Sequence, residues 1–580
     1  MVSRLQQPIE APESFSDKRI LLLAVAIFLF SGVLIIRLFV MQVLQHDFYT
    51  ALATKRQEVV KSLTPERGSM YTRDQNSELY PLVTNREYFL AYAEPVKITD
   101  TAKFIDAVVP VLGLEEAVWK DLLGRINKEG DPYEPIVDKV TKAQKEQLEA
   151  LDLAGLGFVS ETKRFYPDKN LGGHIFGFVG FQEDKKIGQY GLEGYFNDEL
   201  SGKSGLLRSV KDALGSLIAI GPRQIEQAEN GSDIVLTVDR NIQFNACQKL
   251  KEFYDWFKAE SGTVIIMRPT GAILAMCSFP DFDPEFYNEV EDINDLSNPA
   301  IFTAYEPGSV FKAVTMAAGL DTGEVEPTTT YTDEGEVKVG PYTIRNSDLK
   351  GHGEQNMIYV LEKSLNTGAI FVQQKVGKNR FRDYVKKFGF GELTGIELDT
   401  EGTGNIESLD KSGDIYSITA SYGQGITVTP LQMITAFATI ANNGALPKPY
   451  IVSEKISPDG AIEKIEPHNV RQVVSPKAAT LLSGMLTSVI EQGYDAKAKV
   501  PGYYMAGKTG TAQIADGHGG YGVQTIHTFI GFGPVSNPQF VILIKLDKPQ
   551  GPRFASDTLS PLFSQLGEYL VHYWEIPPDY

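Results

Sequence analysis

The first fifty residues contain an apolar run long enough to cross a lipid bilayer. Residues 20–36 are all apolar or small, and residues 38–44 continue the run past Arg37. About 25 such residues span a hydrocarbon core of roughly 30 Å, and lipid forces the backbone into a helix because it offers no other hydrogen-bond partners. Lys18 and Arg19 precede the run, which favours a cytoplasmic N-terminus and places the rest of the chain outside the cytoplasm.

A cleaved signal peptide is the main alternative for this segment. The run is too long for one, and no A-x-A-like cleavage site follows it. We therefore predict a cytoplasmic tail at 1–19 and a transmembrane anchor at 20–44 that contacts membrane lipid. Arg37 would then lie near the outer interface or contact a partner in the membrane.

The remaining chain should form two folded modules, because 580 residues are too many for one hydrophobic core. The polar, glycine-punctuated stretch 45–230 is predicted to be a non-catalytic module of mixed structure, and 231–580 to be the catalytic module. The formal charge of −19, with no basic stripe, argues against a general nucleic-acid binder.

The catalytic module has the pattern of an α+β fold. A hairpin signal at 268–271 joins two apolar runs, and two further runs flank a turn at 536–538. We expect an antiparallel sheet with helices on its faces. The expected strands are 234–238, 263–267, 272–277, 528–532 and 540–546, and the expected helices are 241–256, 309–320 and 559–573.

Three short strings in this module have the residue types of a serine acyl-transfer site. Ser309–Lys312 offers a nucleophile and a lysine base, Ser364–Asn366 a hydroxyl and an amide, and Lys508–Gly510 a cation on a glycine-flanked strand. Each string is common by itself, so the argument depends on their joint occurrence and their context. Ser309 follows Glu306-Pro307-Gly308 and begins an apolar, alanine-rich run, which predicts that Lys312 lies one helical turn further on the same face.

The chemistry assigns a role to each string. A serine hydroxyl is a weak nucleophile until a base removes its proton, and lysine is a base only when it is neutral. Burial and a nearby cation both lower the pKa of a lysine. We therefore assign Ser309 as the nucleophile, Lys312 as its base, and Lys508 as the nearby cation.

The other residues of the strings would bind and orient the substrate. Ser364 would relay a proton to the leaving amine, and Asn366 would hold the substrate amide and orient Lys312. Lys508 and Thr509 would bind a substrate carboxylate, with Gly510 and Thr511 beside them. The backbone N–H groups of Ser309 and Thr511 would form an oxyanion hole, in which each donor contributes about 3–4 kcal/mol.

At this point the chain resembles the class B penicillin-binding proteins, which are monofunctional peptidoglycan transpeptidases. The string at 421–430 is most similar to the division-specific branch of that family. Two departures from the family pattern, at 70–74 and at 298–300, lie outside the catalytic strings and concern local packing and partner contacts. The strings that carry the resemblance are 305–312, 508–513, 236–243, 67–68 and 191–194.

The resemblance implies the fold and the reaction. It implies a single transmembrane helix, an elongated pedestal or dimerisation-like domain at 45–230, and a penicillin-binding, serine β-lactamase-like transpeptidase domain at 231–580. Ser309 would be acylated by the D-Ala-D-Ala end of a peptidoglycan stem peptide, and an amine of a neighbouring stem would take the acyl group during septal cell-wall synthesis. β-lactams would acylate the same serine.

The resemblance also implies partners and leaves alternatives. Family members work beside a polytopic glycosyltransferase of the shape, elongation, division and sporulation (SEDS) group and other cell-wall synthesis proteins. A D,D-carboxypeptidase would use the same residues with water as acceptor. A serine β-lactamase needs a separate deacylating glutamate, whereas Glu362 is part of a string that overlaps the second motif. A non-catalytic scaffold should have lost Ser309 or Lys312, and a β-lactam sensor should carry several membrane helices.

Cysteine and histidine usage predicts no metal and no cofactor. The seven histidines include no H-x-x-x-H pair, and the chain has no phosphate-binding G-x-x-x-x-G-K-[ST] loop. His518 and His527, near the third string, are expected in loops or at the surface. Cys247 and Cys277 could pair, but the favoured expectation is two buried thiols.

Overall fold

A computed structural model describes residues 17–46, 58–73, 78–128, 130–168, 172–183, 185–210, 224–515 and 520–580. Most of the expected cytoplasmic tail, residues 1–16, lies outside these ranges. Contacts divide the chain into two compact units. One consists of Met1–Pro65 and Lys203–Glu229, and the other of Glu66–Gly202 and Asn230–Tyr580.

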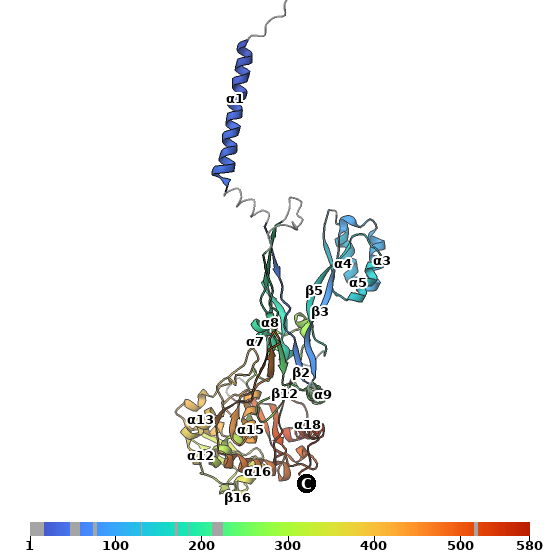
Figure 1. The fold of residues 1–580 in the computed structure, drawn as a ribbon. Helices are drawn as coiled ribbons and strands as arrows, with labels where there is room; N and C mark the ends of the chain where they lie inside the picture. Colours follow the sequence, from blue (N-terminus) through green and yellow to red (C-terminus); the bar gives the residue numbers. More distant parts are fainter. Residues whose placement is uncertain are drawn as a thin grey trace, which may run out of the picture. The chain divides into compact units, whose positions relative to one another are not determined.

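The first unit contains the apolar helix. Helix α1 (Asp17–Phe39) continues into a π-helical turn, η1 (Val40–Leu44), and the apolar span runs from Arg19 to Leu44 (Figure 1). Its side chains are exposed along almost the whole span, as lipid-facing residues would be. The structure therefore contains the one N-terminal apolar helix that was expected, and its role as a transmembrane anchor at 20–44 stays a prediction. In the same unit, β1 (Glu58–Leu63) pairs with β8 (Gly205–Val210), and β8 pairs with β9 (Gln224–Glu226).

The N-terminal part of the second unit, residues 66–202, is built around one long strand. Strand β3 (Leu79–Ala93) pairs antiparallel with β2, β4 and β5, and three helices bury an apolar core against it. Asp100 caps α3 and a Thr141–Gln144 capping box begins α5, which explains where these helices start. The elements are β2 (Met70–Arg73), α3 (Thr101–Leu112), α4 (Glu116–Ile126), β4 (Glu134–Val140), α5 (Lys142–Glu149), β5 (Leu156–Phe165), α6 (Gly173–Phe176), β6 (Phe178–Gln182), β7 (Lys185–Gln189), α7 (Gly191–Tyr195) and α8 (Asn197–Ser201).

A buried charge cluster ties together two of the strings that carried the family resemblance. The carboxylate of Glu193, fully buried, accepts hydrogen bonds from Arg67 Nε and Arg164 Nε, both at 2.6 Å. Gly68, next to Arg67, lies so close to Ser232 that a Cβ would sit 1.9 Å from its carbonyl oxygen. The glycines in these strings therefore permit close backbone approach around an ion cluster.

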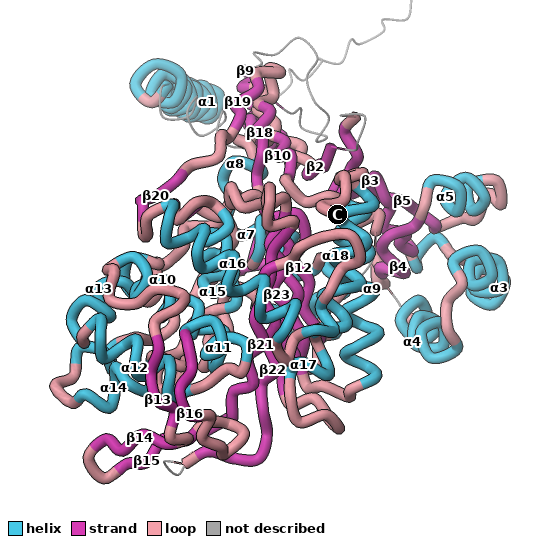
Figure 2. The backbone as a smooth tube through the Cα atoms, turned by 90° about the horizontal axis from the view of Figure 1, so that it is seen from below, coloured by secondary structure: helices cyan, strands magenta, loops and turns pink. Residues whose placement is uncertain are grey.

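The catalytic part contains a five-stranded antiparallel sheet in the order β12-β11-β23-β22-β21. Its strands are drawn in magenta near the centre of Figure 2. Alternate residues of each strand face opposite sides, so the sheet separates two apolar cores. One core holds α10, α15 and α16, and the other holds α9 and α18. The strands are β11 (Ser261–Met267), β12 (Ile273–Phe279), β21 (Ala506–Ala515), β22 (Tyr521–Gly533) and β23 (Phe540–Asp547), and the helices are α9 (Arg240–Trp256), α10 (Lys312–Asp321), α15 (Pro430–Ala441), α16 (Pro476–Gln492) and α18 (Ser560–Tyr573).

Smaller elements surround this sheet. Strand β10 pairs in parallel with β2 and antiparallel with β18, so one sheet joins the N-terminal part of the second unit to its catalytic part. The remaining elements are β10 (Asp233–Leu236), β13 (Thr330–Asp333), β14 (Glu336–Val339), β15 (Tyr342–Arg345), β16 (Gly353–Asn356), α11 (Met357–Glu362), α12 (Asn366–Val376), α13 (Lys378–Lys387), α14 (Asp414–Ala420), β17 (Ala445–Pro447), β18 (Val452–Ile456), β19 (Ile462–Lys464), β20 (Asn469–Gln472) and α17 (Ala555–Thr558), with short 3₁₀ helices η2 (Pro95–Lys97), η3 (Pro284–Glu289), η4 (Ile293–Leu296), η5 (Gly308–Phe311), η6 (Glu407–Asp410) and η7 (Ala496–Ala498).

The predicted α+β class, with an antiparallel sheet flanked by helices, is confirmed. The expectation of two unpaired thiols is wrong, because Cys247 on α9 and Cys277 on β12 form a disulfide with their Cα atoms 5.6 Å apart. Both side chains face the same core, between the helix and the sheet. The domain limits 45–230 and 231–580 stay a prediction.

Candidate active site

The nucleophile string lies on a tight turn at the start of α10. Gly308 has φ +59°, and residues 308–311 form a 3₁₀ helix before the α-helix begins at Lys312. The helix expected to begin at Ser309 therefore starts as a 3₁₀ helix, which is common at the start of an α-helix. Val310 and Phe311 are buried and anchor the turn, whereas Ser309 is only half-buried.

The second string brings a hydroxyl to the lysine. Lys312, which is 1% exposed, donates from Nζ to the Ser364 carbonyl at 2.6 Å and to Ser364 Oγ at 3.1 Å. In the described part of the chain, both of these hydrogen bonds join Lys312 to Ser364, and neither joins it to Ser309. Ser364 links α11 to α12 with φ +55°, a strained conformation for a non-glycine residue that is concentrated at functional sites.

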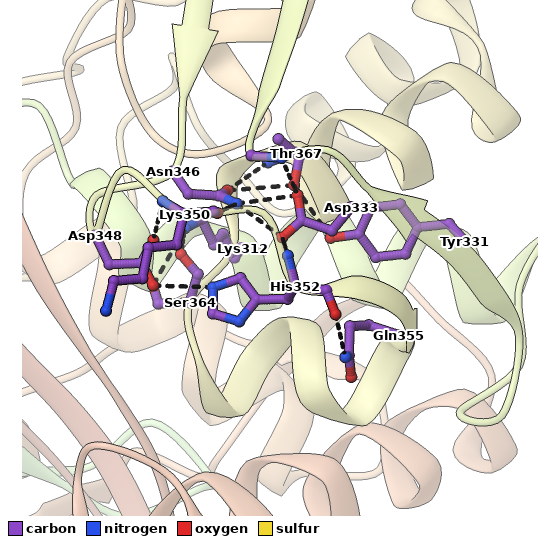
Figure 3. Close-up of polar contacts among 11 residues, drawn as sticks. Lys312, Tyr331, Asp333, Asn346, Asp348, Lys350, His352, Gln355, Ser364 and Thr367 are labelled. Atoms are coloured by element: carbon purple, nitrogen blue, oxygen red, sulfur yellow. Dashed lines mark hydrogen bonds and ion pairs between the residues drawn. The ribbon is translucent and has the colours of Figure 1, made fainter.

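A buried polar network holds the start of α12 in place (Figure 3). Asp333 accepts hydrogen bonds from Asn346 Nδ2 at 3.0 Å and from Thr367 Oγ1 at 2.8 Å, and Asn346 Oδ1 accepts from the Thr367 amide at 3.2 Å. Asn366, next to Thr367, donates from Nδ2 to the Arg345 carbonyl at 2.8 Å. The sequence predicts that the Asn366 side chain orients Lys312. In the structure, the hydrogen bond given for the Asn366 amide is to β15, and those given for Lys312 Nζ are to Ser364.

The third string lies on β21, the edge strand of the sheet, and packs against the nucleophile turn. A Cβ on Gly510 would lie 2.8 Å from the Pro307 carbonyl oxygen, and one on Gly308 would lie 3.2 Å from Ala512 Cβ. This contact places Thr511 beside the turn that carries Ser309. Thr511 Oγ1 accepts a hydrogen bond from the Ala555 amide at 3.0 Å, which leaves its own proton free to be donated.

Two buried lysines, Lys312 and Lys508, lie near enough for the charge of one to act on the other. Burial, and then the charge of Lys508, hold the pKa of Lys312 well below the usual lysine range. Burial also lowers the pKa of Lys508, and the Asp495 carboxylate opposes that shift. Folding therefore buries both lysines and lowers the pKa of each, and the assignment of Lys312 as the base stays a prediction.

The segment 421–430 forms another wall of the site. The Gly308 amide donates to the Gly423 carbonyl at 2.9 Å, and Thr315 Oγ1 donates to the Ser421 carbonyl at 2.7 Å. Gly423 has φ +82°, and a Cβ there would lie 2.1 Å from the Gly308 carbonyl oxygen. The glycines of this string, used above only to judge the branch of the family, position the nucleophile turn.

Sequence reasoning missed Asp495 and misplaced His527. Asp495 is fully buried and accepts hydrogen bonds from both the amide and the hydroxyl of Thr509, but nothing in its spacing marks it. His527, expected in a loop or at the surface, is buried on β22, where its ring bonds to Thr525 and Thr558 and burial lowers its pKa to about 4. His518 lies outside the described residues.

No group of three or more His, Cys, Asp or Glu side chains that could hold a metal ion occurs within the described ranges. The groups that the structure gathers are hydroxyls, backbone amides and two lysines. Such a constellation is typical of serine acyltransferases.

Comparison with known proteins agrees with this class. The family model for the penicillin-binding protein transpeptidase domain matches residues 262–567, and the model for the penicillin-binding protein dimerisation domain matches 62–236. Stage V sporulation protein D of Bacillus subtilis is 31% identical over 556 residues, covering 94% of this chain and 84% of that protein. The penicillin-binding protein PbpB of Mycolicibacterium smegmatis is 32% identical, covering 73% and 67% of the two chains.

Solved structures show the same architecture. The crystal structure of penicillin-binding protein 3 from Mycobacterium tuberculosis in complex with aztreonam superposes with a TM-score of 0.67 at 26% identity, covering 90% of this chain and 98% of that one. Penicillin-binding protein 2X from Streptococcus thermophilus has a TM-score of 0.74 at 22% identity, covering 89% and 80% of the chains, and supports the fold alone. The chain belongs to the class B penicillin-binding proteins, and its catalytic part is their transpeptidase domain.

Proposed function

We propose that this chain cross-links peptidoglycan as a D,D-transpeptidase, with Ser309 as the nucleophile and Lys312 as its base. The observation that supports this most is the buried lysine pair. Lys312 bonds to Ser364, and its pKa is held down by burial and by Lys508. A lowered pKa increases the neutral fraction of a lysine, and a neutral lysine can remove the proton from a serine hydroxyl one helical turn away.

The proposed reaction has two steps. Ser309 Oγ attacks the carbonyl of the penultimate D-Ala of a stem peptide while Lys312 takes the hydroxyl proton. The C–N bond then breaks, the terminal D-Ala leaves with a proton relayed through Ser364, and an ester on Ser309 remains. The amine of a second stem attacks this ester, the new amide bond forms, and the bond to Ser309 Oγ breaks. The proton that the amine loses passes to Ser309 Oγ through Ser364 and Lys312.

Substrate orientation is proposed to come from β21 and from Asn366. As an edge strand, β21 can pair with an extended peptide through its backbone. The N–H groups of Ser309 and Thr511 would stabilise the oxyanion of each tetrahedral intermediate. Because the Thr509 hydroxyl donates to Asp495, Thr511 is better placed to donate to the substrate carboxylate, beside the charge of Lys508 and next to Gly510.

The catalytic domain is proposed to lie outside the cytoplasm of a bacterial cell, anchored by α1. Lys18 and Arg19 before the apolar run favour that orientation. The disulfide between Cys247 and Cys277 supports it, because disulfides persist in oxidising compartments. We further propose a role in septal synthesis beside a SEDS-type glycosyltransferase, which the membrane helix and the domain at 45–230 would contact.

Labelling by penicillin tests the nucleophile. The full-length protein in detergent should form a stable ester with a fluorescent penicillin, and mass spectrometry should place it on Ser309. Ser309→Ala should abolish the label without changing the thermal unfolding midpoint. A label that persists on another serine would overturn the assignment.

The acceptor is tested separately. With a stem peptide and an added D-amino acid as amine acceptor, a transpeptidase should release the exchanged peptide. Hydrolysed peptide alone would instead identify a D,D-carboxypeptidase with the same acyl-enzyme.

A further inference from the structure

A buried carboxylate outside the three strings is in contact with the third one. Asp495 follows α16 and precedes the short helix η7, and it is fully buried. Its Oδ2 accepts from the Thr509 amide at 3.0 Å, and its Oδ1 accepts from Thr509 Oγ1 at 2.8 Å. Asp495 Oδ2 also lies 4.0 Å from Lys508 Nζ, with both side chains almost inaccessible to water.

Burial of a charged group without a partner is costly, so the two charges depend on each other. Lys508 Nζ donates to the Thr509 carbonyl at 3.1 Å, so the lysine and the carboxylate both bond to Thr509, one through its carbonyl and the other through its amide and hydroxyl. Within the described part of the chain, the charged groups that act on Lys508 are Lys312 on α10 and Asp495 before η7. Lys508 therefore lies between an anion that stabilises its charge and a base that its charge acts upon.

We propose that Asp495 is a positioning residue for the acyl-transfer site: it fixes β21 through Thr509 and keeps Lys508 charged, so that Lys508 in turn keeps Lys312 neutral. The proposal rests on the roles proposed above for Lys312 and Lys508. It assigns Asp495 no contact with the substrate.

The expected effect follows from the order of the charges. Without the carboxylate, Lys508 loses its proton at lower pH, and the repulsion that lowers the pKa of Lys312 weakens. A plot of the acylation rate constant against pH rises where Lys312 becomes neutral and falls where Lys508 loses its charge. In the variant, the rising (acid) limb of this profile moves to higher pH, and the falling (alkaline) limb moves to lower pH. Loss of strand anchoring alone would lower the whole profile without moving either limb.

The test is the pH dependence of acylation by a fluorescent penicillin in full-length Asp495→Asn. This variant keeps the shape and most hydrogen-bonding capacity of the side chain. We expect each limb to move inward by about one pH unit or more, with the rate constant at pH 7 falling about tenfold. Limbs at their wild-type positions would overturn the proposal.

Two controls make the result specific. Asp321 at the other end of α10 accepts from Tyr384 Oη at 2.6 Å and from the Ser475 amide at 2.7 Å, so Asp321→Asn removes a similar carboxylate away from the lysines and should leave both limbs in place. Ser309→Ala separates the hypotheses. If that variant still labels, the proposed function fails; if only the Asp495→Asn limbs stay fixed, the inference alone fails.

A second measurement applies if Asp495→Asn is too unstable for the acylation assay. Adding Lys508→Met to the same chain removes the uncompensated charge, so the double variant should unfold at a higher temperature than Asp495→Asn alone. A double variant that is as unstable as the single one would overturn charge compensation and leave Asp495 with a hydrogen-bonding role only.

Discussion

Replacing Gly510 by alanine should damage catalysis far more than it damages the fold. Gly510 lies where β21 meets the nucleophile turn, and a Cβ there would lie 2.8 Å from the Pro307 carbonyl oxygen and 3.3 Å from the Val310 amide nitrogen. Both contacts are with backbone, which cannot move aside as a flexible side chain can. The strand and the turn must therefore separate.

The size of the effect follows from that separation. To restore an ordinary contact of 3.4 Å, the two segments must move apart by about 0.6 Å. The proposed oxyanion donors, the amides of Ser309 and Thr511, lie on opposite sides of this contact. Functional sites tolerate displacements of about 0.5 Å, and loss of one oxyanion donor costs about 10²–10³-fold in rate. We expect the acylation rate constant to fall about 100-fold.

Stopped-flow acylation by a fluorescent penicillin, together with thermal unfolding, measures both effects. Gly484 provides the matched control, because it lies exposed on α16 with open space around it. Gly484→Ala should stabilise the helix by about 1 kcal/mol and leave acylation unchanged. Acylation of Gly510→Ala at the wild-type rate would refute the view that this contact sets the oxyanion geometry.

Three further outcomes follow from the structure. Lys312→Arg, whose side chain stays protonated, should lower the acylation rate constant about 10³-fold. Because the pKa of Lys312 is lowered, acylation of the wild type should remain fast at pH values well below the usual lysine pKa. A wild-type rate that rises only near pH 10 would contradict this. Replacing both Cys247 and Cys277 by alanine should lower the free energy of unfolding by about 3.7 kcal/mol, a value that follows from the sequence separation of 30 residues. In denaturant titrations, reductant should destabilise the wild type by the same amount and should not affect the alanine variant. Glu193→Gln should cost about 3–5 kcal/mol by the same titration, because two arginines lose their buried counter-ion; an unchanged midpoint would show that the cluster is solvated.

The sequence was sufficient for those features that depend on local pattern. The anchor follows from an apolar run that only a helix can satisfy in lipid, and the strands follow from apolar runs punctuated by turn residues. The three strings and their order indicated the acyl-transfer chemistry. Even the shift of the Lys312 pKa could be expected, because the chemistry requires a neutral lysine and Lys508 was available to lower it.

The sequence was not sufficient where contacts join distant segments. Asp495 precedes Lys508 by a helical turn and a loop, and a lone aspartate after a helix is typical of ordinary turn chemistry. The disulfide needed the packing of α9 on β12, and the burial of His527 needed the helix α17 that covers it. The orientation of Asn366 depends on the carbonyl of Arg345 in a separate hairpin. In each case the missing information was tertiary.

The third string has two separate sets of contacts. Gly510 packs against the nucleophile turn, where a Cβ would lie 2.8 Å from the Pro307 carbonyl oxygen. Thr509 bonds to Asp495, and the Asp495 carboxylate also lies 4.0 Å from Lys508 Nζ. Substitutions at Gly510 and at Asp495 should therefore change the acylation rate in different ways. Crowding at Gly510 displaces the oxyanion donors and lowers the rate at every pH, whereas removing the Asp495 anion changes the charge of Lys508 and narrows the pH range in which the proposed base can work.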